Sequence, residues 1–257
     1  MQIEIKFDDY GERGLVARIV VDYQPRLNIL NTDLISQLAS ALNSLSANEH
    51  LRVLILTGAG DRAFVGGADV NEMAALNKTS AKSFITGLHE ACTALRNIPV
   101  PVIARISGYC LGAGLEIAVS CDLRIAADHS VFGMPEVKVG IPSVIEAAIL
   151  PRLIGWGKAA ELIYTGETIS AAEAVACGLI ERSVPANQLD VAVDRWINAI
   201  LEAAPRAIRL QKRLLREWER LPLDEAIELG IEMFAEAYET DEPRVFMQRF
   251  LNRRNVP

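Results

Sequence analysis

The sequence predicts an α/β fold in which parallel strands alternate with helices and a helical C-terminal region follows. Apolar, β-branched runs typical of buried strands recur between segments whose apolar residues have helical spacing. Runs of the strand type stop near residue 187, and only helical spacing continues. Hydrophobic residues make up 51% of the 257 residues, which is enough to fill a large core. We therefore expect a core at residues 1–186 and a helical region at residues 187–257.

The individual elements are expected from hydrophobic periodicity. Residues 1–7 alternate polar and apolar side chains, as a half-exposed strand does. Further strands are expected at residues 15–21, 51–58, 100–106 and 123–127. Helices are expected at residues 34–45, 81–97, 111–121, 189–203, 206–220, 223–238 and 242–253. Thr32 and Asp33 are the candidates to cap the first of these helices.

Charge and hydropathy exclude several classes of protein. The net charge of −7 argues against broad nucleic-acid binding, although it leaves room for a local basic pocket that binds a phosphorylated ligand. No apolar run reaches the roughly 20 residues of a membrane helix. The N-terminus lacks the basic start and apolar stretch of a signal peptide. We expect a cytoplasmic protein that binds neither nucleic acid nor membranes.

The residues that commonly bind metals are sparse. No CxxC pair occurs among the four cysteines, which are Cys92, Cys110, Cys121 and Cys177. The three histidines, His50, His89 and His129, are far apart in the sequence. The spacings fit no zinc site, and a Ser-His-Asp triad has little to draw on. We therefore expect reduced thiols and no metal.

Two glycine-bearing turns each precede an expected helix. The first spans residues 63–70 and the second spans residues 108–116. Glycine lets the backbone approach a ligand closely, and the first N–H groups of a helix can bind an oxygen that carries negative charge. Neither a dinucleotide fingerprint starting at Gly58 nor a Walker-type phosphate loop fits the spacing. Two tight turns without any chemical role remain an alternative.

Two acids lie in apolar surroundings. Glu116 follows Ala113 by three residues in the most apolar helical stretch, so both should lie on one helix face. Glu136 follows Pro135 at the expected end of a strand. Each has an ordinary explanation, because Glu116 could interact with a helix dipole and Glu136 could pair with Lys138. Together, after two turns rich in N–H groups, they suggest an acid–base pair.

These segments resemble the crotonase superfamily, whose founding type is enoyl-CoA hydratase. The likeness covers nearly the whole chain and is most specific at residues 63–70, 108–116, 121–126 and 132–136. Residues 162–174 are a further match, to a threonine-glycine turn of the family's scaffold. It implies a crotonase-like ββα spiral core, and it makes the C-terminal region a trimerisation region. The assembly implied is a homotrimer or a dimer of trimers.

The resemblance also implies roles for individual residues. The N–H groups of Ala68 and Ala113 would form an oxyanion hole, although the second position is usually glycine. Glu116 and Glu136 match the two catalytic glutamates of the hydratases. The other residues expected to contact substrate are Gly66, Gly67, Asp69, Val70 and Gly112 in the turns, and Phe250 and Arg253 at the C-terminus. The last two would reach the coenzyme A of a neighbouring subunit, or would simply end an amphipathic helix with a solvated basic tip.

With both glutamates present, the resemblance favours an enoyl-CoA hydratase. Such an enzyme adds water syn to a 2-enoyl-CoA and forms a 3-hydroxyacyl-CoA through an oxyanion-stabilised enolate, with no cofactor beyond the coenzyme A of the substrate. Other crotonase-type isomerases, decarboxylases or C–C hydrolases are the alternative. The second alternative is a non-catalytic or RNA-binding protein of this fold.

One segment departs from the family. After Pro142 the family usually has a glycine-rich run, whereas this chain has residues 143–147, Ser-Val-Ile-Glu-Ala. Ser143 and Glu146 have the spacing of a capping box at a helix start. The other interpretation is a reshaped acyl pocket with a third carboxylate within reach.

Overall fold

The protein is built on two β-sheets, as seen in a computed structural model that describes residues 1–254, with side chains to residue 252. The larger sheet has six strands in the order β1-β2-β3-β5-β7-β10, and the smaller has four in the order β4-β6-β8-β9. Only β1–β2 and β8–β9 pair antiparallel, and every other pair is parallel. The predicted α/β class is confirmed.

The strands of the larger sheet are β1 (Gln2–Asp9), β2 (Leu15–Asp22), β3 (Leu51–Gly58), β5 (Val102–Ile106), β7 (Leu123–Ala127) and β10 (Arg182–Val184). The strands of the smaller sheet are β4 (Ala63–Val65), β6 (Tyr109–Leu111), β8 (Val131–Gly133) and β9 (Thr168–Ser170).

The α-helices are α1 (Thr32–Ser46), α2 (Val70–Ala74), α3 (Lys78–Asn97), α4 (Ala113–Ser120), α5 (Leu150–Thr165), α6 (Ala171–Ala176), α7 (Leu189–Glu202), α8 (Pro205–Trp218), α9 (Leu223–Ala237) and α10 (Glu242–Arg254). Short 3₁₀ helices are η1 (Gly11–Arg13), η2 (Gln24–Arg26), η3 (Pro135–Val139), η4 (Ile145–Ile149) and η5 (Ala186–Gln188).

The chain passes repeatedly from the larger sheet to the smaller one and then into helix. β3 leads to β4 and then to α2 and α3, β5 leads to β6 and α4, and β7 leads to β8 and the helices that follow it. Each such ββα unit adds one strand to each sheet. Because the units stack in parallel, the turns that leave the smaller sheet come to lie side by side.

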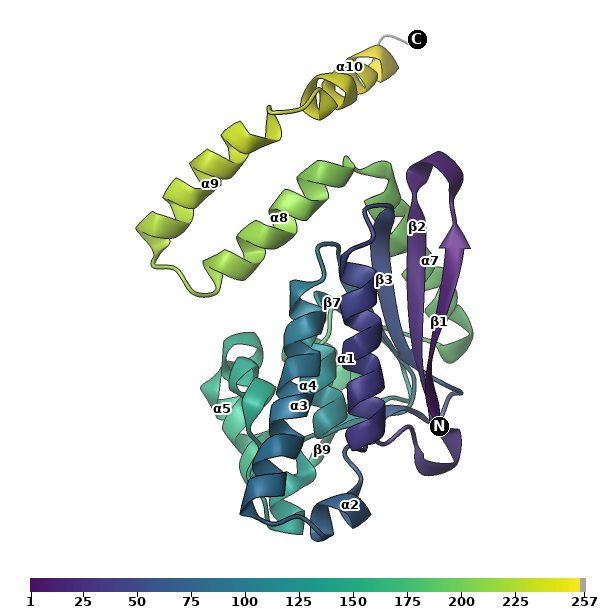
Figure 1. Ribbon diagram of the computed structural model, residues 1–257, viewed down its shortest axis with the longest axis vertical. Coiled ribbons are helices and arrows are strands. Elements are labelled where there is room, and N and C mark those ends of the chain that lie inside the picture. The colour runs from purple at the N-terminus through teal and green to yellow at the C-terminus, as the bar shows by residue number, and fades with distance from the viewer. Residues whose placement is uncertain (255–257) are drawn as a thin grey trace.

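Helices cover both faces of the larger sheet. α1 and α3 run side by side in front of it, and α7 lies behind it (Figure 1). Leu189, Val193 and Ile197 of α7 are spaced by four residues, so they form one apolar stripe against the sheet. Arg52 of β3 is buried and donates to the carbonyl oxygens of Ile200 and Ala203, which fixes the end of α7.

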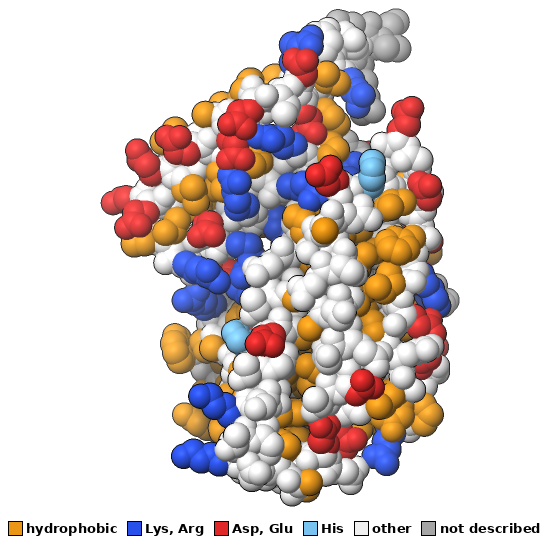
Figure 2. Space-filling view, in the orientation of Figure 1, with side chains coloured by type: hydrophobic (Ala, Val, Ile, Leu, Met, Phe, Trp, Pro, Cys, Tyr) orange, Lys and Arg blue, Asp and Glu red, His pale blue; other side chains and the backbone are white. Residues whose placement is uncertain are grey.

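The helices beyond the sheet begin with α8. α8, α9 and α10 extend away from the two sheets, and Figure 2 shows acidic, basic and hydrophobic side chains mixed on their surface. The expected boundary at residue 187 stays a prediction, and α7 on its far side packs on the sheet. No helix in the described part of the chain is long and apolar enough to cross a membrane.

Most element bounds lie within a few residues of those expected from the sequence. One difference concerns the start of α1, where Thr32 and Asp33 were the expected caps. Asn31 is the N-cap instead, and its side chain accepts a hydrogen bond from the N–H of Leu34. Asparagine is as good a capping residue as aspartate, so the helix begins at Thr32 rather than at Leu34.

Candidate active site

A cavity of about 680 Å³ lies where the turns of the smaller sheet meet α3. Its wall is mostly hydrophobic. The turns and the segments after β8 contribute Gly66, Gly67, Ala68, Val70, Leu111, Gly112, Ala113, Glu116, Pro135, Glu136, Lys138, Val139, Ile141, Pro142 and Val144. The opposite wall comprises Met73, Leu76, Ala81, Lys82, Phe84, Ile85 and Leu88. An apolar cavity with a few polar groups is typical of a small-molecule site.

The two glycine-bearing turns lie together because the strands before them pair. β4 and β6 are parallel neighbours, with Ala63 opposite Tyr109 and Val65 opposite Cys110. A Cβ atom on Gly114 would lie 2.1 Å from the carbonyl oxygen of Val65, so only glycine allows α4 to pack this closely on β4. Both turns therefore open into the same cavity.

Ala68 and Ala113 line this cavity, and their N–H groups have no protein acceptor among the described residues. Ala68 lies between Gly67, whose carbonyl accepts from Leu30, and Asp69, whose N–H donates to Leu30. Ala113 is the first residue of α4, where an N–H has no partner within the helix. Two free donors on adjacent turns can hold one oxygen that gains negative charge.

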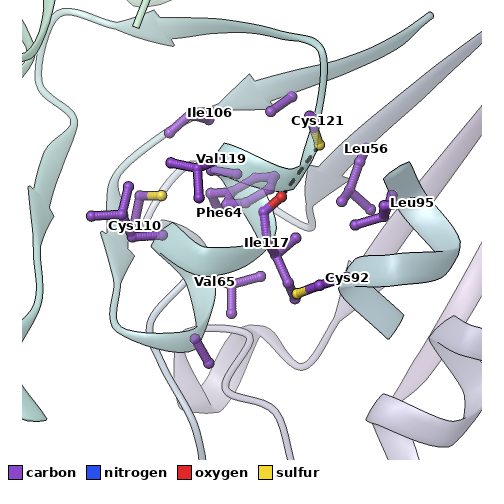
Figure 3. Packing of buried hydrophobic residues seen from close by; sticks show 14 of the residues in the cluster. Leu56, Phe64, Val65, Cys92, Leu95, Ile106, Cys110, Ile117, Val119 and Cys121 are labelled. Atoms are coloured by element: carbon purple, nitrogen blue, oxygen red, sulfur yellow. Dashed lines mark hydrogen bonds between the residues drawn. The ribbon is translucent and has the colours of Figure 1, made fainter. Parts of the chain in front are cut away.

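The core holds α4 rigidly in front of β4. Ile117 and Val119 of α4 are buried, and Figure 3 shows them among Phe64, Val65 and Cys92, which come from β4 and α3. The Cys121 thiol donates to the carbonyl of Ile117 at 3.5 Å, which is the dashed line in the figure. A helix packed on all sides positions its first turn precisely enough to present an N–H and a side chain to one ligand.

Glu116 lies in the first turn of α4 and is 4% exposed. Its Oε1 accepts a hydrogen bond from the N–H of Ala147 at 3.3 Å. Burial raises the pKa of Glu116 to about 8, with further increases from the charges of Glu136 and Glu146, and the Ala147 N–H opposes the rise. Glu116 therefore holds a proton at neutral pH.

Glu136 is half-buried and approaches the cavity from η3, directly after β8. The hydroxyl of Ser143 donates to its Oε2 at 2.8 Å. A Cβ atom on Gly112 would lie 2.6 Å from Glu136 Oε1, and Gly112 has a φ of +52°. Glycine at this position thus accommodates both the turn and the carboxyl group of Glu136. Glu136 forms no ion pair with Lys138, so the interpretation as a paired surface acid is wrong.

Comparisons with known proteins show the family of the chain. Residues 12–257 match the model of the family described as Enoyl-CoA hydratase/isomerase. The chain is 33% identical over 246 residues to the short-chain-enoyl-CoA hydratase of Clostridium acetobutylicum, covering 95% of this chain and 94% of that protein. It is also 33% identical to the crotonyl-CoA hydratase of Syntrophomonas wolfei, covering 94% and 93% of the two chains.

A solved structure shows the same fold. The crystal structure of an enoyl-CoA hydratase from Bacillus anthracis superposes with a TM-score of 0.91 at 32% identity and covers 97% of this chain and 96% of that one. The chain belongs to the enoyl-CoA hydratase/isomerase family. The family expected from the sequence, and with it the crotonase fold, is confirmed.

Within this family member, the segment 143–147 differs from its sequence-based interpretation as a capping box. Val144 is the N-cap of η4, and no side chain caps that helix. Ile145 has a φ of +40°, which redirects the chain and turns the two side chains apart. Ser143 bonds Glu136, whereas Glu146 is buried against His89, with 2.8 Å between Oε1 and Nδ1. Val144, rather than Glu146, lines the cavity.

Two expected substrate contacts, Asp69 and Phe250, do not line this cavity, and a third, Arg253, lies outside the described side chains. Asp69 caps α2 by accepting from the N–H of Asn71, and it does not line the cavity. Phe250 lies on α10, outside the cavity of its own chain, and its side chain is 57% exposed. The side chain of Arg253 lies outside the described residues. Their contacts with coenzyme A stay predictions.

Sequence patterns did not indicate that α3 forms one wall of the cavity. Phe84 and Leu88 are four residues apart on one helix face, so their helical spacing indicated burial but not what they would face. His89 was only a scattered histidine in the sequence, and its pairing with Glu146 spans 57 residues. Among the described residues, no cluster of His, Cys, Asp or Glu side chains is suited to hold a metal ion.

Proposed function

We propose that the protein is an enoyl-CoA hydratase that adds water across the conjugated double bond of a 2-enoyl-CoA thioester. The observation that carries the proposal is the meeting of two free N–H donors and two glutamates in one apolar cavity. The names of the two relatives, a short-chain-enoyl-CoA hydratase and a crotonyl-CoA hydratase, support the same reaction. The apolar wall suits an acyl chain.

The thioester oxygen would bind between the N–H groups of Ala68 and Ala113. When water attacks the β-carbon, electrons move onto that oxygen and form an enolate. The two donors stabilise the enolate more than the neutral carbonyl, and losing one such donor typically costs about 3–4 kcal/mol of barrier. Backbone donors supply this stabilisation, so the proposed reaction uses no metal or further cofactor.

Glu116 and Glu136 would hold the attacking water and move its protons. One carboxyl takes a proton from the water while the other gives a proton to the α-carbon, so the pair needs a single proton between them. In the unliganded site burial favours the protonated form of Glu116, because it raises the pKa of this carboxyl group to about 8. Addition of water then leaves the total number of protons on the pair unchanged.

We also propose that the active assembly is a homotrimer or a dimer of trimers, working in the cytoplasm. Leu223, Ile227, Ile231 and Phe234 of α9 are between 55% and 74% exposed and recur every three or four residues. An exposed apolar stripe of this kind favours burial against another subunit. Phe250 and Arg253 would then reach the coenzyme A of that subunit.

Hydration of crotonyl-CoA tests the reaction, because saturating the double bond removes the ultraviolet absorbance of the conjugated thioester. We expect steady loss of this absorbance and formation of 3-hydroxybutyryl-CoA, unchanged after prolonged chelation. Longer enoyl-CoA substrates would cover the case of a different preferred chain. Failure to hydrate any of them would contradict the proposal, as would activity that chelation abolishes and a divalent metal restores.

A further inference from the structure

The carboxyl group of Glu136 has a single hydrogen-bond partner among the residues that the structure describes. The hydroxyl group of Ser143 donates to its Oε2 at 2.8 Å. The other oxygen, Oε1, lies beside Gly112, since a Cβ atom there would be 2.6 Å away, and Gly112 precedes the free N–H group of Ala113. Oε1 accepts no hydrogen bond from the described residues and is not sealed from solvent, so it is open to the cavity that Glu136 lines.

A tight turn brings Ser143 back to Glu136, although the two residues are seven positions apart in the sequence. Gly140, with a φ of +83°, reverses the chain after η3, and the N–H group of Ile141 donates to the carbonyl of Glu136 at 3.2 Å. Pro142 then fixes its own φ directly before Ser143. The local backbone therefore delivers the hydroxyl group to the carboxyl group.

The backbone after Ser143 is held in place as well. Ile145 has a φ of +40°, a conformation that costs free energy in a β-branched residue and persists only where the surroundings enforce it. Beyond it, the N–H group of Ala147 donates to Glu116 Oε1 at 3.3 Å, and Ala147 itself is buried. The segment that carries Ser143 is thus constrained on both sides, which gives its hydroxyl group a defined position.

A glutamate carboxyl group without such a partner is poorly oriented. The last side-chain torsion of glutamate has a broad, roughly two-fold preference, so the plane of the carboxyl group is not fixed by the rotamer alone. Catalytic groups must lie within roughly 0.5 Å and 10–20° of the productive geometry, and hydrogen bonds from fixed neighbours achieve this. The bond from Ser143 occupies Oε2 and leaves Oε1 for the ligand.

We infer that Ser143 is a positioning residue that fixes the carboxyl plane of Glu136 and makes Oε1 the oxygen that exchanges a proton during the reaction. A glycine in this place, as in the glycine-rich run usual in the family, would supply no hydroxyl group. The contact therefore belongs to the departure of this chain at residues 143–147. The inference rests on the proposed hydratase function, which gives Glu136 its part in moving the protons of water.

Hydration kinetics of Ser143→Ala test the inference. Loss of the hydroxyl group should lower kcat by about 10-fold or more, because misplacing a reacting group by about 1 Å can cost about 100-fold. KM should stay nearly unchanged, since Ser143 does not line the cavity. Ser143→Thr keeps a hydroxyl group and should restore most of kcat. Ser44→Ala is the control, because it removes a hydroxyl group bonded to the carbonyl of Ala41 on α1, outside the cavity lining, and should leave kcat unchanged.

A double-mutant cycle with Glu136 separates positioning from general support of the segment. If Ser143 acts through Glu136, adding Ser143→Ala to Glu136→Gln should lower kcat no further. A loss that persists in the Glu136→Gln background would overturn the inference, as would wild-type kcat in Ser143→Ala. If Ser143→Ala does not fold, Ser143→Cys allows the same comparison, because its side chain is of similar size but a weak donor.

The orientation of Glu136 can also be measured without any reaction. Crystal structures of the unliganded proteins should show one orientation of the Glu136 carboxyl group in the wild type and a rotated or divided one in Ser143→Ala. If the orientation changes in this way but the wild type hydrates no enoyl-CoA, the positioning by Ser143 stands and the hydratase proposal fails. If the wild type hydrates its substrate and Ser143→Ala keeps both the orientation and kcat, the hydratase proposal stands and the role of Ser143 fails.

Discussion

The carboxyl group of Glu116 is buried, and burial disfavours its negatively charged form. Its folded-state pKa of about 8 lies above the ordinary value of 4.5, mainly because of burial. Between these two pH values the unfolded chain has lost this proton and the folded chain has kept it. The contribution of Glu116 to stability is therefore present at low pH and is lost as pH rises towards 8.

The loss of stability with rising pH leads to a prediction for Glu116→Gln, whose side chain has no proton to lose. Through this group alone, the unfolding free energy of the wild type should fall by about 1.4 kcal/mol per pH unit within that window. The Gln variant should therefore gain stability relative to the wild type as pH rises from about 5 to 8, and the gain should level off above pH 8. Denaturant unfolding of both proteins across this range measures the difference.

The exposed acid Glu90 supplies the control for that measurement. Glu90→Gln removes an equal charge from the surface, so its stability difference from the wild type should change little with pH. A Glu116→Gln difference that stayed constant from pH 5 to pH 8 would mean that Glu116 is already ionised in the folded protein.

The site residues that could be predicted from the sequence are those whose neighbours in the structure are also close in the sequence. Ala68, Ala113 and Glu116 lie in strand–turn–helix segments whose glycines and apolar residues are adjacent in the sequence, and the structure brings all three to one cavity. The partner of Glu146, His89, is 57 residues away in the sequence, so no short sequence pattern indicated the pair. Its pairing with His89 exists only because η4 packs on both α3 and α4.

At the scale of elements, the capping box expected at Ser143 and Glu146 does not form, because the backbone differs from the one that this motif needs. The spacing of Ser143 and Glu146 fits that motif, which requires the chain to enter an α-helix at once. The left-handed backbone at Ile145 and the 3₁₀ geometry of η4 prevent this. Ser143 then finds a stronger acceptor in Glu136. A motif of side chains predicts a contact only where the backbone takes the geometry that the motif assumes.

The element α8 is tied to the core by a buried cation. Lys212 is 6% exposed and donates to the carbonyl of Val100 at 2.9 Å and to Asp122 at 2.7 Å. Asp122 in turn accepts from the N–H of Val102. These bonds join α8 to the starts of β5 and β7. Helical spacing in the sequence predicted α8 itself, but a lysine in an amphipathic helix gave no indication of this anchor.

At the scale of the whole molecule, the helices beyond the sheet extend well past the core (Figure 1). α8 and α9 are joined by ion pairs of Arg206 and Arg213 with Glu236, and by a small hydrophobic cluster whose buried members are Leu210, Leu214 and Met233. The outward stripe of α9 therefore adds little to the stability of a single chain and is available to another copy.

Association through α9 is testable by sedimentation. The wild type should sediment as a trimer or a hexamer, because burying this stripe removes apolar area from water. Replacing Ile231 and Phe234 together with Glu should dissociate the assembly and raise KM for enoyl-CoA, since Phe250 would no longer reach a neighbouring site. Val191→Glu, at an exposed position on α7, is the control and should leave the assembly intact. A wild type that is monomeric and fully active at assay concentration would contradict the proposal.

The central claim is that Glu116 and Glu136 act together as the acid–base pair of a hydratase. Steady-state hydration of the best enoyl-CoA substrate by Glu116→Gln, Glu136→Gln and the double variant tests it most directly. Gln keeps the size and hydrogen bonding of Glu but exchanges no proton at neutral pH. Each single change should lower kcat by about 100-fold or more and leave coenzyme A affinity nearly unchanged, and the double variant should lose less than the product of the two. Near-wild-type kcat in either single variant would contradict the account.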